Sequence, residues 1–218
     1  MLKHHLKKLC FISSWIFLNS MAFAVNTDTL YLQQNTIVID GNLNDWVTIP
    51  YSSTFVKHDD NTTSTQKTKA KVTWDNENLY LAFDVEDTEI VGKIQSQDAA
   101  FFETDDLVEF FIDPDGDGQN YLEIGINASG SVYDYVIKCP NASCGGWADD
   151  QVFDVKDMEI ETTIDGTLNN PNDVDTGYIV ECKIPFSSLT NISAGNFTKP
   201  SNNNSWKMNL FRIDYGIK

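Results

Sequence analysis

The chain contains 218 residues, with 32 acidic and 15 basic side chains, and its formal net charge is −17 at pH 7. A negative charge of this size repels phosphate backbones and anionic lipid surfaces, which excludes nucleic acid as a partner. The length fits one domain of a size that β-sandwiches commonly reach.

Residues 1–24 have the pattern of a secretory signal peptide. Three lysines precede an apolar run over 9–18, and Ala22-Phe23-Ala24 follows as a small-x-small cleavage sequence. The run is shorter than the roughly 20 apolar residues that a membrane span requires, so no membrane span is predicted. We therefore expect cleavage after Ala24, a secreted or periplasmic protein, and a single domain over residues 25–218.

Alternation of apolar and polar residues dominates the rest of the chain and predicts an all-β protein. Short polar turns between the apolar runs indicate hairpins. The expected fold is an antiparallel two-sheet β-sandwich, jelly-roll or immunoglobulin-like, with little helix. The predicted strands cover residues 36–40, 70–75, 79–85, 108–112, 122–126, 131–138, 151–164, 178–184 and 206–215.

Several aromatic residues and cysteines have predicted structural roles. Trp74, Phe83 and Phe110 fall on core-facing positions of their strands, and Trp46 is expected to anchor the first segment. Cys182 alternates with apolar neighbours, which favours a buried, inert thiol. In an oxidising compartment Cys139 and Cys144 are close enough in sequence to form a disulfide across a small loop.

Five segments carry a family resemblance, in the order IDGNLNDW (39–46), WDNENLYLAFDVED (74–87), DDLVEFFIDPDGDG (105–118), GYIVECKIPFSSL (177–189) and WKMNLFRID (206–214). Together they resemble the carbohydrate-binding module family 9-like domains of the DOMON-like β-sandwich superfamily. The resemblance implies an exported module that binds saccharides and occurs in or beside polysaccharide-degrading enzymes, with a secreted glycoside hydrolase as a partner.

The sequence departs from that family at three positions. Well-understood members clamp a sugar between two tryptophans, and here Phe101 and Phe102 stand near the first of them. Gly125 falls where such members have a sugar-binding arginine, and the chain stops at Lys218, before the usual strand with the second tryptophan. Either the domain is truncated at its C-terminus or its site is built differently.

The DPDGDG segment has two interpretations. Asp113, Asp115 and Asp117 with Gly118 match the start of an oxygen-rich calcium loop, and family members can carry structural calcium. The twelfth position is Ile124 rather than a bidentate glutamate, and the same residues also form a good hairpin turn. The alternatives are a structural Ca²⁺ site and a simple turn.

Four residues are the candidate ligand contacts. Phe102 and Trp147 are expected to stack on sugar rings, and Glu109 and Arg212 to bind hydroxyl groups. Glu109 is the contact that the resemblance carries over directly. The alternatives are a solvated surface position for Glu109 and a structural ion pair for Arg212.

No catalytic residues are predicted, because neither a nucleophile elbow nor a histidine-based triad is visible in the sequence. The leading hypothesis is non-catalytic binding of a saccharide. One alternative is a b-type haem domain, whose axial ligands would come from His58, Met158, Met208 or a lysine. The other is a structural module whose sugar site has decayed.

Overall fold

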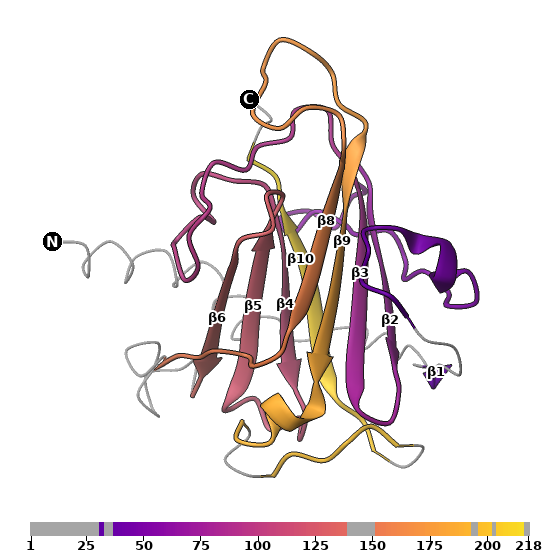
Figure 1. The fold of residues 1–218 in the computed structure, drawn as a ribbon, viewed down its shortest axis with the longest axis vertical. Coiled ribbons are helices and arrows are strands. Elements are labelled where there is room, and N and C mark those ends of the chain that lie inside the picture. Colours follow the sequence, from indigo (N-terminus) through magenta and orange to yellow (C-terminus); the bar gives the residue numbers. More distant parts are fainter. Residues whose placement is uncertain (1–30, 33–36, 139–150, 193–195, 202–203, 216–218) are drawn as a thin grey trace, which may run out of the picture.

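The computed structural model describes residues 31–32, 37–138, 151–192, 196–201 and 204–215, which form two packed β-sheets (Figure 1). The first sheet has the order β1-β2-β3-β9-β8 and the second the order β10-β4-β5-β6-β7. All neighbours pair antiparallel except β1, which runs parallel to β2. The predicted antiparallel sandwich is confirmed.

The strands of the first sheet are β1 (Tyr31–Leu32), β2 (Thr68–Trp74), β3 (Asn78–Glu86), β9 (Gly177–Pro185) and β8 (Glu159–Asp165). Those of the second are β10 (Lys207–Ile213), β4 (Leu107–Asp113), β5 (Tyr121–Asn127), β6 (Val132–Ile137) and β7 (Gln151–Val152). Helix is limited, among the described residues, to the short 3₁₀ turns η1 (Leu43–Trp46) and η4 (Phe186–Leu189). None of the described helices is long and apolar enough to cross a membrane.

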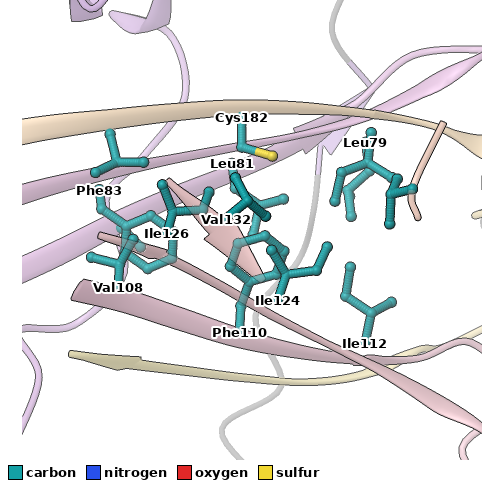
Figure 2. Close-up of a cluster of buried hydrophobic side chains, with 14 of the residues drawn as sticks. Leu79, Leu81, Phe83, Val108, Phe110, Ile112, Ile124, Ile126, Val132 and Cys182 are labelled. Carbon is teal, nitrogen blue, oxygen red and sulfur yellow. The ribbon is translucent and has the colours of Figure 1, made fainter. Parts of the chain in front are cut away.

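The core lies between the sheets and consists of the inward-facing apolar residues of both (Figure 2). Leu81 of the first sheet and Phe110 and Ile124 of the second belong to one buried cluster. The rings of Phe83 and Phe110 stack across the interface, with centroids 6.1 Å apart. Burial of each such side chain stabilises the fold by about 1.5–3 kcal/mol. Cys182 is a free, fully buried thiol in the same cluster, as predicted.

The strand predicted over residues 36–40 is wrong for its described residues, 37–40. None of them pairs with a strand, and the chain wraps around a buried carboxylate from residue 40 onward. Oε2 of Glu181 on β9 accepts hydrogen bonds from the backbone N–H groups of Asp40, Gly41 and Asn42, at 3.0, 2.5 and 3.1 Å. Its Oε1 accepts the indole N–H of Trp46 at 2.6 Å. Trp46 is fully buried and anchors this segment, as expected.

The single strand predicted over residues 151–164 is two strands that belong to different sheets. β7 pairs with β6 of the second sheet, and β8 pairs with β9 of the first. Between them Oδ2 of Asp134 accepts the backbone N–H of Val155 at 2.7 Å, and Asp157 adopts a left-handed φ of 58°. The chain therefore turns from one sheet to the other where continuous alternation suggests a straight strand.

Candidate functional site

The outer face of the second sheet, turned away from the core, brings several candidate residues together. Paired residues of neighbouring strands point to the same side of a sheet, so the register defines rows of neighbours. The row through Glu109 contains Phe211, Glu109, Gly125 and Tyr133. The next row contains Asn209, Phe111, Glu123 and Tyr135.

Glu109 lies at the centre of this face and is bound by Tyr133. The Tyr133 hydroxyl donates a hydrogen bond to Oε1 of Glu109 at 2.5 Å, and the two residues are 2% and 7% exposed. The tyrosine ring lies over Gly125, where an added Cβ would be only 2.3 Å from its Cζ atom. Glycine in a strand interior often marks such a close approach. Residue 125 must stay small for Tyr133 to reach Glu109.

Two carboxyl groups share this network. Burial raises the pKa of Glu109, while hydrogen bonds from Tyr133 and Glu123 oppose that rise. Burial also raises the pKa of the Tyr133 hydroxyl, as do the nearby charges of both glutamates. A hydrogen bond between two carboxyl groups requires a proton on one of them. That proton lies between the two carboxyl groups, so the pair offers a hydroxyl-bearing ligand its remaining acceptor oxygens.

Phe102 borders the same network. Its ring meets Tyr133 edge-on at 6.1 Å, and it is partly exposed. Phe101 is fully buried and also contacts Tyr133, with ring centroids 4.9 Å apart. Tyr133 thus packs against one fully buried and one partly exposed phenylalanine.

Two further aromatic rings extend the outer face. Tyr135 and Phe211 are both partly exposed. The ring of Tyr135 lies 5.8 Å from that of Tyr133, and the ring of Phe211 contacts Phe111 edge-on at 5.6 Å. Aromatic faces of this kind can stack on the apolar C–H faces of sugar rings.

Arg212 points to the opposite side of the sheet, contrary to the expectation that it acts together with Glu109. It pairs with the core residue Val108, so its side chain projects between the sheets and is only 7% exposed. Its Nη2 atom forms ion pairs with Asp87 at 2.6 Å and Asp214 at 3.1 Å. The structural ion pair, the alternative role for this arginine, is the one that the structure shows.

The family model for carbohydrate family 9 binding domain-like proteins matches residues 39–214. The chain belongs to this family. Carbohydrate binding is the function to which its family assigns it. A search of curated proteins finds no match for the chain.

Two solved structures share this family 9-like fold. A family 9 carbohydrate-binding module from Caldicellulosiruptor kristjanssonii, in complex with cellotriose, is 19% identical with a TM-score of 0.53, and the match covers 83% of this chain and 74% of that one. A protein from Bacteroides uniformis ATCC 8492, whose proposed role is carbohydrate binding, is 14% identical with a TM-score of 0.62. That match covers 80% of this chain and 75% of the other.

This family 9-like domain has Gly125 at the position where the resemblance to sugar-binding members leads one to expect an arginine. The ring of Tyr133 occupies the space above Gly125 and binds Glu109 in place of a guanidinium group. Sequence reasoning did not find Tyr133. The available signal was a glycine inside an alternating strand, followed one hairpin later by a strand rich in tyrosine.

The acidic turn of this domain folds around Asp113. Its two carboxylate oxygens accept the backbone N–H groups of Gly116 and Gly118, both at 2.9 Å. Three carboxylate oxygens of the turn, one each from Asp113, Asp115 and Asp117, lie within 4.8 Å of one another. Such a set of oxygen donors fits a hard cation such as Ca²⁺. Burial raises the pKa of Asp113, and so does the neighbouring Asp115.

The remaining sequence predictions concern residues elsewhere. Trp147 and the pair Cys139 and Cys144 lie outside the described residues. For the haem alternative, two cavities in the described part of the chain were compared, and neither is lined by both His58 and a methionine. His58 is exposed in a loop, and Met208 packs against the core.

Proposed function

We propose that the outer face of the second sheet binds a saccharide and does not convert it chemically. One observation carries this proposal: the hydrogen-bonded pair of Glu109 and Tyr133 is bordered by the partly exposed rings of Phe102, Tyr135 and Phe211. Stacking on these rings would supply affinity, and the carboxyl network would orient the sugar hydroxyls.

The geometry of the two glutamates supports a non-catalytic role. Glycosidases use two carboxyl groups about 5–5.5 Å apart when they retain configuration and about 6.5–9.5 Å apart when they invert it. Glu109 and Glu123 hydrogen-bond to each other instead, and both are buried. A pair joined in this way differs from the separated carboxyl groups of both glycosidase classes.

A structural neighbour supports a choice of saccharide class. A family 9 module of similar fold has been solved with cellotriose. Glucose-based oligosaccharides are therefore the first ligands to test. We also propose that the chain is exported after cleavage at Ala24 and serves a secreted glycoside hydrolase, which the leader pattern and the family resemblance support.

A structural Ca²⁺ in the acidic turn is part of the same proposal. Asp113, Asp115 and Asp117 would hold the ion by one carboxylate oxygen each. Three negative side chains at such a separation repel one another, and a divalent cation would relieve that repulsion. The ion would stabilise the turn between β4 and β5 and take no part in sugar contacts.

Isothermal titration calorimetry with cellotriose and a panel of plant and algal oligosaccharides, in calcium-containing buffer, tests the binding site. We expect Tyr135→Ala and Phe102→Ala to abolish measurable heat, because each removes a stacking surface. Tyr51→Ala is the matched control, since Tyr51 is an exposed tyrosine that hydrogen-bonds to Asp84 of the first sheet. Unchanged affinity in both site variants would refute the assignment to this face.

The structural-module alternative also has an observation in its favour, because Glu109 and Tyr133 are more than nine-tenths buried. If the parent chain gives no heat with any saccharide in the panel, that alternative is the better account of the face. The Glu109–Tyr133 pair would then serve only to fix β4 against β6.

A further inference from the structure

A cavity of about 410 Å³ lies where residues of both sheets meet the chain that passes between them. Val132 of β6 and Ile160 of β8 contribute to its lining, together with residues of the segment that joins β7 to β8. The volume is in the range of roughly 300–1,000 Å³ that is typical of small-molecule sites. Neither Glu109 nor Tyr133 lines this cavity, so it is separate from the proposed saccharide site.

The apolar part of the lining is aliphatic. Val132 and Val155 are 5% and 7% exposed, and Met158 and Ile160 pack against the main core cluster. No aromatic side chain is among the described residues that line the cavity. Because sugar rings are bound by stacking on aromatic faces, this lining favours a hydrocarbon chain over a saccharide.

The charged part of the lining is acidic. Its described residues include four aspartates, Asp98, Asp134, Asp154 and Asp157, and no lysine, arginine or histidine. Burial raises the pKa of Asp134, and the nearby charges of Asp98 and Asp154 raise it further. These carboxylates therefore repel one another, and a cation in the cavity would relieve that repulsion.

Asp134 is a buried carboxylate with one oxygen that no described residue binds. It pairs with Ile124 in the inward-facing row of the second sheet and is only 5% exposed. Its Oδ2 accepts the backbone N–H of Val155 at 2.7 Å, whereas its Oδ1 accepts no hydrogen bond from the described part of the chain. Oδ1 is not among the fully buried unpaired atoms, so it remains accessible from the cavity that Asp134 lines. An unused carboxylate oxygen in a buried site is unfavourable unless a donor reaches it.

The spacing of the four aspartates does not suit a single metal ion. Ca²⁺ is held by about six to eight oxygen atoms at about 2.3–2.6 Å, so its ligands must converge. Over the residues that the structure describes, no three of these aspartates place carboxylate oxygens within 4.8 Å of one another. Separated carboxylates match a ligand whose positive charges are also separated.

We propose that this cavity binds an aliphatic polyamine, a flexible hydrocarbon chain that carries several ammonium groups. One ammonium group donates a charge-assisted hydrogen bond to Oδ1 of Asp134. The methylene groups pack against Val132 and Ile160, and a second ammonium group pairs with Asp154, which is exposed. The proposal does not depend on the saccharide site, because the two sites use different residues.

Calorimetry with spermidine on the full chain tests the proposal. We expect one spermidine per chain at about 0.15 M salt, where attraction between distant exposed charges is largely screened. Asp134→Asn should weaken binding at least about tenfold, because it removes the buried charge but keeps an oxygen that accepts the N–H of Val155.

The matched control is Asp59→Asn. Asp59 is exposed and does not line the cavity, and its substitution changes the net charge by the same amount. It should leave the affinity for spermidine unchanged. MgCl₂ at an equal concentration of positive charge should not displace spermidine, because the carboxylates do not converge on one ion.

Three results would overturn the proposal. They are the absence of saturable spermidine binding, displacement of spermidine by MgCl₂, and equal weakening in Asp134→Asn and Asp59→Asn, which would indicate general attraction to an acidic protein. If Asp134→Asn does not fold, Asp154→Asn decides the question, because Asp154 is exposed and its substitution leaves the core intact. Asp154→Asn should weaken binding several-fold, and an affinity equal to that of the parent overturns the proposal.

Discussion

Gly125→Ala is the substitution whose effect the structure specifies most closely. Its Cβ would lie 2.3 Å from Cζ and 2.6 Å from the hydroxyl oxygen of Tyr133, so the ring must move away. Such overpacking costs about 1–3 kcal/mol. The movement also breaks the hydrogen bond from Tyr133 to buried Glu109, which adds about 1–3 kcal/mol.

The opposing gain is small. Alanine in a strand interior is otherwise favoured over glycine by about 0.5–1 kcal/mol, because it restricts the unfolded chain. We therefore expect Gly125→Ala to lower the free energy of unfolding by about 1–5 kcal/mol, measured by urea denaturation with an unchanged m-value.

A double-mutant cycle shows whether the clash is the cause. In a Tyr133→Ala background the space above residue 125 is open, so Gly125→Ala should be neutral or mildly stabilising there. The coupling energy between the two positions should then be about 2–6 kcal/mol. If Gly125→Ala is neutral in the parent chain, or equally harmful in both backgrounds, the packing of Tyr133 over Gly125 is refuted.

Three further predictions concern buried groups. Glu181→Gln should lower the free energy of unfolding in urea by about 2–4 kcal/mol. The amide NH₂ group would replace an acceptor oxygen that faces either the indole N–H of Trp46 or three backbone N–H groups. Glu161→Gln is the control and should cost little, because Glu161 is exposed on β8. Burial, with help from two nearby aspartates, raises the pKa of Asp134 from 3.8 to about 6. The parent should therefore gain about 1–3 kcal/mol of stability as pH falls from about 6 to about 4, and Asp134→Asn should lose that gain. An equal gain in both chains would contradict the assignment of the effect to Asp134. Burial also raises the pKa of Cys182, so peptide-mapped alkylation should label it only in denaturant; rapid labelling of the native chain would count against a buried thiol.

Strand alternation predicted much of the fold because each long strand has one dry face. In β4 the pattern correctly placed Phe110 inside and Glu109 outside. It failed for residues 36–40, whose backbone N–H groups bind Glu181, 141 residues away from Asp40. A local pattern contains no information about a partner so distant in sequence.

The candidate site was harder to predict than the fold because it depends on register. Whether Tyr133 lies opposite Gly125 is set by the pairing of β5 with β6, and a shift by one residue would turn that ring to the other face. The inward direction of the Arg212 side chain could have been predicted from strand alternation. It alternates with Met208 and Leu210, which pack against the core, so it shares their inward direction.

The two polar networks of the second sheet therefore lie on opposite sides of the same strands. β10 sends Phe211 to the outer face and Arg212 into the interior, and β4 alternates in the same way between Glu109 and Val108. The outer network is bordered by partly exposed rings, and we propose that a ligand contacts the face there. The inner network holds the ends of the sheets together and is closed to a sugar. Alternate residues of two neighbouring strands therefore serve the proposed recognition on one side and the packing of the sandwich on the other.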